Sequence, residues 1–391
     1  MRAYLDHAAT TPLLPEVLEA YTRALAVVGN PSSIHAHGQQ AKRQLEESRE
    51  RLAAVLRCDP VEVVFTSGGT EAINAALKGF WWARSTGGSR RSIVVPPGEH
   101  HATTDTVEWL EAHEGARVLE VPVDDDGRVD PSSFEATLTA AGADAAVASV
   151  IWANNEVGTI QPIAALADVA RAQEVPLHSD AVGAFGSLPI DFRASGLDAL
   201  SVSAHKIGGP VGIGALILSR GATVVPLLHG GGQQRRIRSG TQDVASAVAF
   251  ALAAELAADR LDAHAAHLVR LRDRLIAGVR ALAPDAVLRG SPSDRLPGNA
   301  HFTFPGCDGD SLLFLLDMAE VSVSTGSACT AGVSEISHVL LGMGVPEREA
   351  RGALRFSLGP SSTDAEVDAL LGALPAALDR ARAAGHSDRT R

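Results

Sequence analysis

Ser201-Val-Ser-Ala-His-Lys-Ile-Gly-Gly-Pro-Val-Gly-Ile-Gly-Ala-Leu-Ile-Leu218 is the stretch around which the chain is organised. An apolar, strand-like run leads into Lys206, and a glycine-rich segment follows it. The chain has 34 Lys and Arg residues but only three lysines, so Lys206 stands out. An amine can form a Schiff base with an aldehyde, which a guanidinium cannot do, and glycines let the backbone approach a flat ligand closely. On this stretch alone, a surface lysine in a glycine-rich turn is the alternative.

The composition indicates a globular protein with two domains, or one large domain and a smaller lobe. The chain has 391 residues, of which 46% are hydrophobic and 20% charged. A net charge of −12 disfavours a general nucleic-acid or anionic-membrane binder. Three cysteines favour a reducing compartment over a disulfide framework, and no Cys/His spacing resembles a zinc site. Without an apolar leader or a spanning run, we expect a cytoplasmic protein.

Buried strands alternate with helices from about residue 60 to residue 220, which predicts an α/β fold with a mostly parallel, doubly wound sheet. We expect a large domain over 15–260. Residues 1–14 and 261–391 should form a smaller α/β domain, with a cysteine loop at about 324–337. A helix is expected around 107–112 in the larger domain, and helices at 243–260 and 261–282 should connect the two lobes.

Polar side chains follow the predicted strands at their ends, where open α/β sheets bind ligands. In the first unit, a short strand meets Thr66-Ser-Gly-Gly-Thr70 and a helix follows directly. This arrangement suits phosphate binding at a helix N-terminus, with an ordinary Ser/Thr helix cap as the alternative. The strand ends together supply a hydroxyl, an imidazole, an amide, a carboxylate and an amine: Thr70, His100, Asn155, Asp180 and Lys206.

Two residues of the C-terminal part are candidates for chemistry. Cys329 lies among Gly, Ser, Ala and Thr, a setting typical of an accessible nucleophile, whereas Cys58 and Cys307 have the setting of packing residues. Arg355 lies inside an apolar strand and needs an anionic partner. A substrate carboxylate fits that need, and a structural ion pair is the alternative.

These residues resemble the pyridoxal-phosphate-dependent cysteine desulfurases, specifically the IscS/NifS-like group of the class V aminotransferase family, which are fold-type-I enzymes. The resemblance covers nearly the whole chain, from Tyr4-Leu-Asp-His-Ala-Ala-Thr-Thr to Leu354-Arg-Phe-Ser-Leu-Gly. Its motifs are Gly29-Asn-Pro-Ser-Ser, Thr66-Ser-Gly-Gly-Thr-Glu, Ala153-Asn-Asn-Glu-Val-Gly-Thr-Ile-Gln-Pro, Ala204-His-Lys, His229-Gly-Gly-Gly-Gln, Arg238-Ser-Gly-Thr and Gly326-Ser-Ala-Cys.

The resemblance implies a role for each matching residue. Lys206 would hold pyridoxal phosphate and shuttle the Cα proton, Asp180 would pair with the ring nitrogen, and His100 would stack on the ring as a third catalytic residue with Cys329. The remaining cofactor contacts would come from Gly69, Thr70, Asn155, Ser203 and His205, with Thr241 reaching in from the partner subunit of a homodimer. The substrate would be bound by Asn155, Arg355 and Asn30.

The reaction implied is the conversion of L-cysteine to L-alanine. The sulfur would stay on Cys329 as a persulfide and pass to acceptor proteins for iron–sulfur cluster assembly and thiolation. The resemblance implies no resident metal, although Cys329 could be a transient iron–sulfur ligand, and no direct membrane or nucleic-acid binding. Two positions depart from the family pattern: Gly183 stands where Gln is usual, and Ile336 stands where Pro is favoured.

Three other functions remain open at this point. An aminotransferase or lyase of the same fold would use Lys206 and Asp180 without Cys329. A desulfurase dedicated to tRNA or DNA sulfur modification would share every residue named above and differ only in its acceptor. The Gly- and Arg-rich segment 230–241 could mark a nucleic-acid-binding module, which the acidic balance and the lack of interleaved aromatic residues disfavour.

Overall fold

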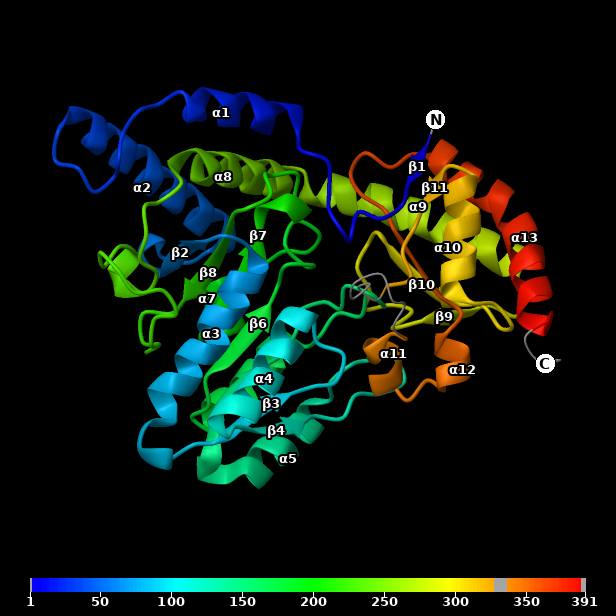
Figure 1. The fold of residues 1–391 in the computed structure, drawn as a ribbon, viewed down its shortest axis with the longest axis horizontal. Helices are drawn as coiled ribbons and strands as arrows, with labels where there is room; N and C mark the ends of the chain where they lie inside the picture. The colour runs from blue at the N-terminus through cyan, green and yellow to red at the C-terminus, as the bar shows by residue number, and fades with distance from the viewer. Residues whose placement is uncertain (1, 327–335, 388–391) are drawn as a thin grey trace.

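The computed structural model describes residues 2–326 and 336–387 and consists of a larger α/β lobe and a smaller lobe (Figure 1). A seven-stranded sheet with the order β2-β8-β7-β6-β5-β3-β4 forms the centre of the larger lobe. Neighbouring strands from β7 to β4 pair in parallel, whereas β8 is antiparallel to both of its neighbours. The predicted fold class, with its mostly parallel sheet, is therefore confirmed. The strands are β2 (Val63–Thr66), β3 (Ser92–Val95), β4 (Arg117–Glu120), β5 (Ala145–Ser149), β6 (Leu177–Asp180), β7 (Ala199–Ser203) and β8 (Gly214–Leu218).

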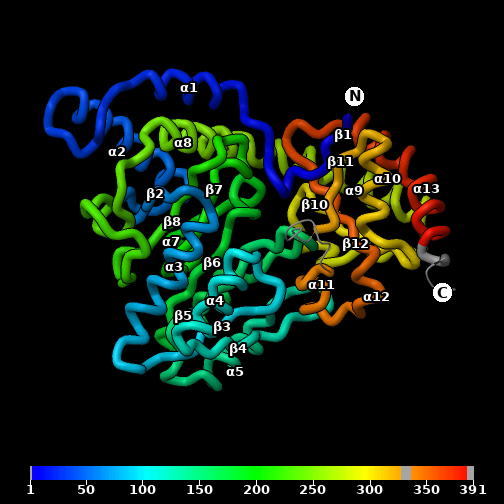
Figure 2. The backbone as a smooth tube through the Cα atoms, in the orientation of Figure 1, coloured from blue at the N-terminus to red at the C-terminus, as the bar shows by residue number. Residues whose placement is uncertain are grey.

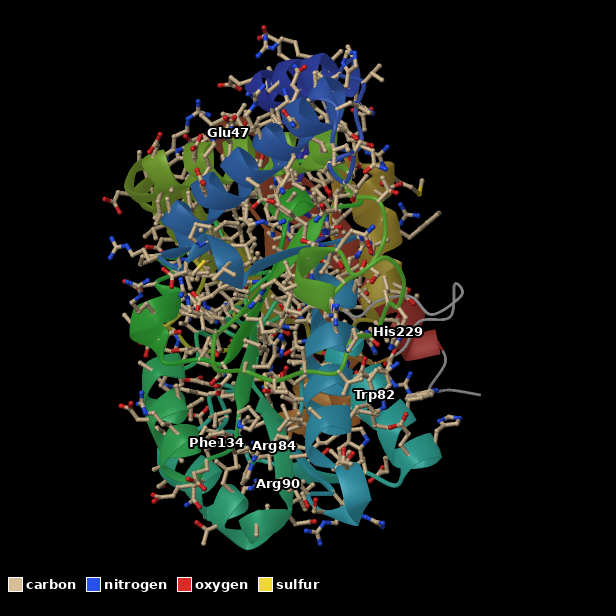
Figure 3. All side chains as sticks on the ribbon, turned by 90° about the vertical axis from the view of Figure 1, so that its left-hand side faces the viewer. Glu47, Trp82, Arg84, Arg90, Phe134 and His229 are labelled. Atoms are coloured by element: carbon tan, nitrogen blue, oxygen red, sulfur yellow. The ribbon has the colours of Figure 1, made fainter. Side chains whose placement is uncertain are left out.

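Helices cover both faces of this sheet, so its central strands are buried on both sides. One face packs against α3 and α4, and the other against α2, α5, α6 and α8. Phe134 of α5 is fully buried in the core between the sheet and the helices of this second face, whereas Glu47 on the outer side of α2 is exposed (Figure 3). The helices of this lobe are α1 (Pro15–Leu25), α2 (Ala36–Leu56), α3 (Gly69–Arg84), α4 (His101–Glu114), α5 (Pro131–Ala141), α6 (Ile163–Ala172), α7 (Phe192–Ser195) and α8 (Val244–Asp259).

The smaller lobe has its own core, built from an antiparallel sheet of order β12-β10-β9 and the helices packed on it. The helix α9 begins two residues after α8 ends and leads from the first lobe into the second (Figure 1). The elements are α9 (Leu261–Leu282), β9 (Val287–Arg289), β10 (Asn299–Thr303), α10 (Gly309–Met318), β11 (Val321–Ser322), α11 (His338–Gly342), α12 (Glu347–Ala350), β12 (Ala353–Ser357) and α13 (Asp364–Ser387).

The N-terminal arm joins the two lobes. Its first strand, β1 (Ala3–Tyr4), pairs in parallel with β11 of the smaller lobe. The chain then crosses the space between the lobes and enters α1 on the larger one (Figure 2). Ala3 and Leu5 belong to the core of the smaller lobe, and Val17 belongs to the core of the larger one. The domain boundaries at residues 14 and 260 stay a prediction that these packing relations support.

Several predicted elements differ from the structure at their ends. The helix expected around 107–112 begins earlier, at His101, because the side chain of His100 caps it by accepting a hydrogen bond from the Ala102 N–H. The helices expected at 243–260 and 261–282 match α8 and α9 closely. Cys58 and Cys307 are buried in the two cores, and burial raises the pKa of Cys58 to about 12. Within residues 2–326 and 336–387, no helix combines the length and apolar character needed to cross a membrane.

Candidate active site

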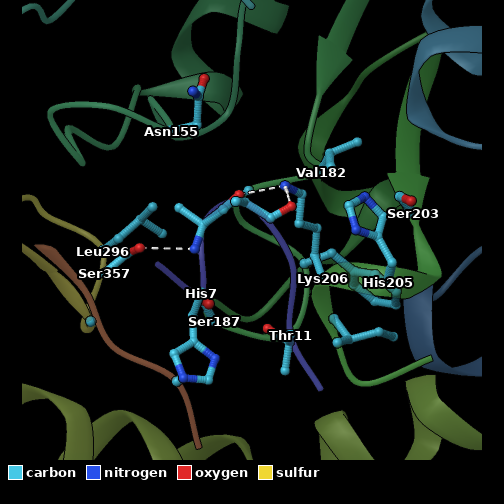
Figure 4. A pocket seen from close by; sticks show the side chains of 18 of the residues that line it. His7, Thr11, Asn155, Val182, Ser187, Ser203, His205, Lys206, Leu296 and Ser357 are labelled. Carbon is cyan, nitrogen blue, oxygen red and sulfur yellow. Dashed lines mark hydrogen bonds between the residues drawn. The ribbon is translucent and has the colours of Figure 1, made fainter. Parts of the chain in front are cut away.

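A cavity of about 750 Å³ lies where the strand ends of the larger lobe face the arm and the smaller lobe (Figure 4). Parallel strands bring their carboxyl ends to one edge, so residues far apart in sequence meet there. The predicted residues that line this cavity are Gly69, Thr70, His100, Asn155, Asp180, Ser203, His205, Lys206 and Arg355. The sequence therefore identified most of the cavity wall formed by the strand ends.

Lys206 extends from the short 3₁₀ turn that follows β7, and its amine is held by the N-terminal arm. Nζ donates hydrogen bonds to the carbonyl oxygens of Ala8 and Ala9, the second at 2.8 Å (Figure 4). Burial and the nearby Arg355 guanidinium lower the pKa of Lys206 to about 8, against the opposing effect of Asp180 and Asp6. About a tenth of this amine is thus uncharged at pH 7, far more than for an ordinary lysine, and only the uncharged amine is a nucleophile.

Asp180 is the only acidic side chain among the described residues that line the cavity. It ends β6, is 3% exposed, and its Oδ1 accepts a hydrogen bond from the Val182 N–H at 2.9 Å. Burial raises the pKa of Asp180, while His100 and Lys206 act in the opposite direction. A buried carboxylate of this kind gains most from a cationic partner inside the cavity.

His100 lies on the same wall as Asp180 and presents a neutral ring. Burial is the main cause that lowers the pKa of His100. Its Nδ1 accepts the hydrogen bond from the Ala102 N–H at 3.0 Å, so in the neutral ring the proton resides on Nε2. The capping bond also fixes the ring orientation, which suits stacking against a flat ligand.

Another part of the cavity wall is suited to an anion. The first turn of the 16-residue helix α3 lines the cavity with Gly69 and Thr70, so free backbone N–H groups and a positive dipole end are available there. A Cβ at position 69 would lie 2.6 Å from Cγ2 of Val182, so glycine permits this close approach. Ser203 and His205 lie nearby on the strand-end wall (Figure 4). Burial, with a smaller effect of Lys206, lowers the pKa of His205 to about 4, so this imidazole binds as a hydrogen-bonding group and not as a cation.

Arg355 lies in β12 on the smaller lobe and is part of a structural ion pair. Its Nη2 donates to Oδ1 of Asp6 at 2.7 Å, and its Nη1 donates to the backbone oxygen of Asn155 at 3.1 Å. Arg355 also lines the cavity, and its buried Nε has no hydrogen-bond partner among the described residues. Both readings of this residue, ion pair and carboxylate binder, are thus compatible with its geometry.

Three predicted site residues are not part of this cavity wall. Asn30 is exposed in a turn, where its Oδ1 accepts a hydrogen bond from the Ser32 N–H at 2.9 Å. Thr241 is exposed and does not line the cavity of its own chain. Cys329 lies outside the described residues, although Ser324 and Gly326 on its N-terminal side do line the cavity.

Sequence reasoning missed the contribution of the N-terminal arm. His7 is 6% exposed and lines the cavity, and burial lowers its pKa. The hydroxyl of Ser357 accepts a hydrogen bond from the Ala8 N–H at 2.9 Å, which fixes the carbonyls that bind Lys206. The segment Tyr4-Leu-Asp-His-Ala-Ala-Thr-Thr is part of the family resemblance, and a His and an Asp in an otherwise extended arm were the only signal of this role.

Comparison with known proteins places the chain in a family. It matches Aminotransferase class-V over residues 3–370. It is 54% identical to the IscS-like cysteine desulfurase of Mycobacterium tuberculosis, and the match covers 98% of each chain. A solved NifS-like protein superposes with a TM-score of 0.89 at 36% identity, covering 97% of this chain and 100% of that one. A structure described as SspA in complex with cysteine has a TM-score of 0.79 at 30% identity, covering 92% and 100%.

The chain belongs to the class-V aminotransferase family, whose members are pyridoxal-phosphate enzymes. Within that family it belongs with the cysteine desulfurases, so the resemblance read from the sequence motifs is confirmed.

The described residues fit pyridoxal phosphate. The cofactor has an aldehyde, a ring nitrogen, a flat aromatic face and a phosphate. The cavity offers Lys206 for the aldehyde, Asp180 for the ring nitrogen and His100 for the flat aromatic face, all on one wall. The α3 N-terminus, with Ser203 and His205, offers N–H and polar side-chain groups for the phosphate.

Proposed function

We propose that the protein removes the sulfur of L-cysteine to give L-alanine and carries it as a persulfide on Cys329. From there the sulfur passes to acceptor proteins for iron–sulfur cluster assembly and thiolation. The observation that carries this proposal is a buried lysine of lowered pKa, about 8, in one cavity with Asp180 and His100. It occurs in a chain that belongs with the cysteine desulfurases.

The division of labour within the cavity follows from the chemistry. Bound pyridoxal phosphate supplies an electron sink that makes the Cα proton of an amino acid acidic. Lys206 attaches the cofactor and moves that proton, since its pKa is lowered to about 8 from the ordinary value of a lysine. The buried carboxylate of Asp180 keeps the ring nitrogen protonated.

The substrate is oriented by groups on both walls. Arg355 and Asn155, which both line the cavity, bind its carboxylate. The thiolate of Cys329 attacks the substrate sulfur, and an S–S bond forms as the Cβ–S bond breaks. The electron pair of the broken bond remains on carbon and takes up a proton, so L-cysteine and a thiol become L-alanine and a persulfide.

The proposal includes a homodimer, in which Thr241 serves the partner's site. Thr241 is exposed and lies outside the cavity of its own chain, as this assignment requires. A reducing, cytoplasmic location fits a reaction whose product is a reactive persulfide. The relatives do not favour an aminotransferase or a dedicated nucleic-acid-modification enzyme.

Mass spectrometry of the cofactor-loaded protein after brief L-cysteine treatment without reductant tests the proposal, with alanine assayed in parallel. We expect one additional sulfur on the Cys329 peptide together with alanine. Alanine without sulfur on Cys329 would reject the persulfide carrier but keep the cofactor chemistry. If neither product forms although cofactor is attached to Lys206, the substrate assignment is wrong.

A further inference from the structure

The segment that follows the undescribed residues 327–335 is attached to the active site by two side-chain contacts. Ser337 donates a hydrogen bond from its hydroxyl to Oε2 of Glu156 at 2.5 Å. His338 donates from Nε2 to the backbone oxygen of Glu99 at 2.7 Å. Glu156 directly follows Asn155, and Glu99 directly precedes His100. In each contact, the accepting residue is thus the direct chain neighbour of a residue that lines the cavity.

Glu156 is held firmly in its own turn. Oδ1 of Asn154 accepts hydrogen bonds from the N–H groups of Glu156 and Val157, both at 2.9 Å. Nδ2 of Asn299 donates to the Glu156 backbone oxygen, also at 2.9 Å. The Glu156 side chain is 2% exposed, so a polar partner is needed to compensate its burial. Ser337 is that partner, and it also caps α11 by accepting a hydrogen bond from the Leu340 N–H.

The helix α11 packs closely on the turn that carries His100. A Cβ on Gly342 would lie 2.7 Å from Cβ of Pro97, and a Cβ on Gly98 would lie 3.3 Å from Cα of Val339. Val157, beside Glu156, shares a small apolar core with Val339 and other residues of this region. The start of α11 is thus fixed by both apolar packing and hydrogen bonds.

The other flank of residues 327–335 meets the same carboxyl group. A Cβ on Gly326 would lie 3.0 Å from Oε2 of Glu156 and 3.4 Å from Nε2 of the buried His301. Gly326 also has a positive φ of 94°, which favours glycine. One oxygen of Glu156 therefore adjoins both Gly326 and Ser337, which precede and follow the segment with Cys329.

We propose that Glu156 is a positioning residue for sulfur transfer, because its buried carboxyl group binds Ser337 and adjoins Gly326 while its turn carries Asn155 into the cavity. This inference rests on the proposed function. In the sequence, Gly326 lies three residues before Cys329 and Ser337 lies eight after it. The hydrogen bond fixes Ser337 to the substrate wall, and Gly326 lies against the same carboxyl group, so both described flanks of the segment with Cys329 are constrained there. Reaction rates depend strongly on the placement of the reacting groups.

The chemistry on the substrate Cα does not need this positioning. Lys206, Asp180 and His100 lie on elements that Glu156 does not contact through any side-chain hydrogen bond among the described residues. Two reactions can therefore be compared in one protein. Exchange of the L-alanine Cα proton with deuterated water needs Lys206 but no thiol, whereas alanine formation from L-cysteine needs both.

The test uses Glu156→Ala, Ser337→Ala and the conservative variants Glu156→Gln and Ser337→Thr, all as cofactor-loaded protein. We expect each alanine variant to lower kcat for alanine formation about tenfold, the loss typical of one hydrogen bond to a buried polar group. KM for L-cysteine and the alanine exchange rate should stay within about twofold. Burial raises the pKa of Glu156, so its role is that of a hydrogen-bond acceptor, and Glu156→Gln should recover most of the rate.

Asp198→Asn is the matched control. Asp198 has a partly buried carboxyl group that accepts a hydrogen bond from the Leu177 N–H at 3.0 Å. It lies at the amino ends of β6 and β7, away from the strand ends that line the cavity. Asp198→Asn should change neither reaction by more than about twofold.

The double variant Glu156→Ala/Ser337→Ala should be no slower than either single variant, because both substitutions remove the same contact.

Three outcomes would overturn the inference. Unchanged kcat in Glu156→Ala and Ser337→Ala means that the contact does not matter for transfer. A parallel fall of alanine exchange and alanine formation means that Glu156 is merely structural. If the wild-type protein exchanges the alanine proton but makes no alanine from L-cysteine, the proposed function itself is rejected. A result confined to the variants would leave the proposed function standing.

Discussion

The two walls of the cavity are built in different ways. The sheet wall carries Lys206, Asp180 and His100, each within a few residues of a strand end, and its positions follow from the parallel sheet. The arm wall carries His7 and Arg355, which come from opposite ends of the chain. The first wall is a product of local motifs, and the second is a product of long-range pairing.

The difference shows in how each wall holds its charges. On the sheet wall, the carboxylate of Asp180 is fixed by a backbone N–H only two residues away. On the arm wall, Arg355 is fixed by Asp6, 349 positions away in the sequence, and the Ser357 hydroxyl binds the arm backbone. Under the proposed function, the groups that serve the cofactor therefore lie on the wall whose geometry is local, while both walls contribute to binding the substrate.

The largest effect should come from the sheet wall, with Lys206→Arg. Arginine keeps the positive charge and the donors for Ala8 and Ala9, but it cannot attach the cofactor. We expect alanine formation to fall at least about 10³-fold, within the range that nucleophilic and proton-transfer roles supply together. Borohydride reduction followed by mass spectrometry would detect cofactor on the wild-type peptide and none on the variant. Covalent cofactor on the variant would contradict the assignment.

Asp180→Asn should have the next largest effect. The amide is nearly isosteric, but it cannot stabilise a protonated ring nitrogen as a carboxylate does. We expect about a 100-fold loss of kcat for alanine formation while cofactor stays attached to Lys206. Steady-state kinetics and the visible absorbance of the bound cofactor would measure the two quantities. A loss below threefold would mean that Asp180 does not serve the ring nitrogen.

On the arm wall, Asp6→Asn should act mainly on stability. The Arg355 side chain is only 5% exposed and that of Asp6 is 21% exposed, so the variant leaves a largely buried charge without its partner. Because Asp6 keeps some solvent access, we expect a loss of about 2 kcal/mol, below the range for fully buried pairs. Denaturant unfolding of the apoprotein measures this change. The exposed Asp364, which pairs with Arg270 and Arg274, gives the control, since Asp364→Asn should destabilise the protein far less than Asp6→Asn does.

The pH dependence of cofactor attachment sharpens the same comparison. Only the neutral amine attacks an aldehyde, and the pKa of Lys206 is lowered to about 8 from an ordinary 10.5. The attachment rate to apoprotein should therefore rise nearly tenfold per pH unit below 8 and level off above it. The unfolded chain holds this proton up to about pH 10.5, so apoprotein stability should rise between pH 8 and 10.5. An attachment rate that climbs steadily to pH 10 would contradict the lowered pKa.

The smallest effect should come from Gly183→Ala. A Cβ at this position would lie 3.3 Å from the Ala153 backbone oxygen and 4.0 Å from Cβ of Asn155, which requires only a small shift. We expect cofactor affinity to change by less than about threefold, measured by absorbance titration of the apoprotein. Gly69→Ala is the contrasting variant, because its Cβ would lie 2.6 Å from Val182 and should weaken binding more strongly. Equal effects of the two variants would show that this close approach is unimportant.

Much of the site was predictable because strand-end motifs combine residue type and position in one short segment. Thr66-Ser-Gly-Gly-Thr70 and Ala204-His-Lys206 each specify a strand end, a turn and a functional group together. The helix around 107–112 was predicted too short, because its cap is a histidine and not one of the usual Ser, Thr, Asp or Asn caps. The role of the arm was missed because an extended segment has no periodicity that reveals its partner.

The sequence by itself determined the α/β class, the lysine, aspartate and histidine of the sheet wall and the family to which they belong. It could do so because each of these features depends on residues that are neighbours in the chain. Only the tertiary structure decided that Asp6 pairs with Arg355, that the Ala8 and Ala9 carbonyls bind Lys206, and that Glu156 binds Ser337. Each of these contacts joins segments more than 180 residues apart, and such contacts depend on the packing of the two lobes.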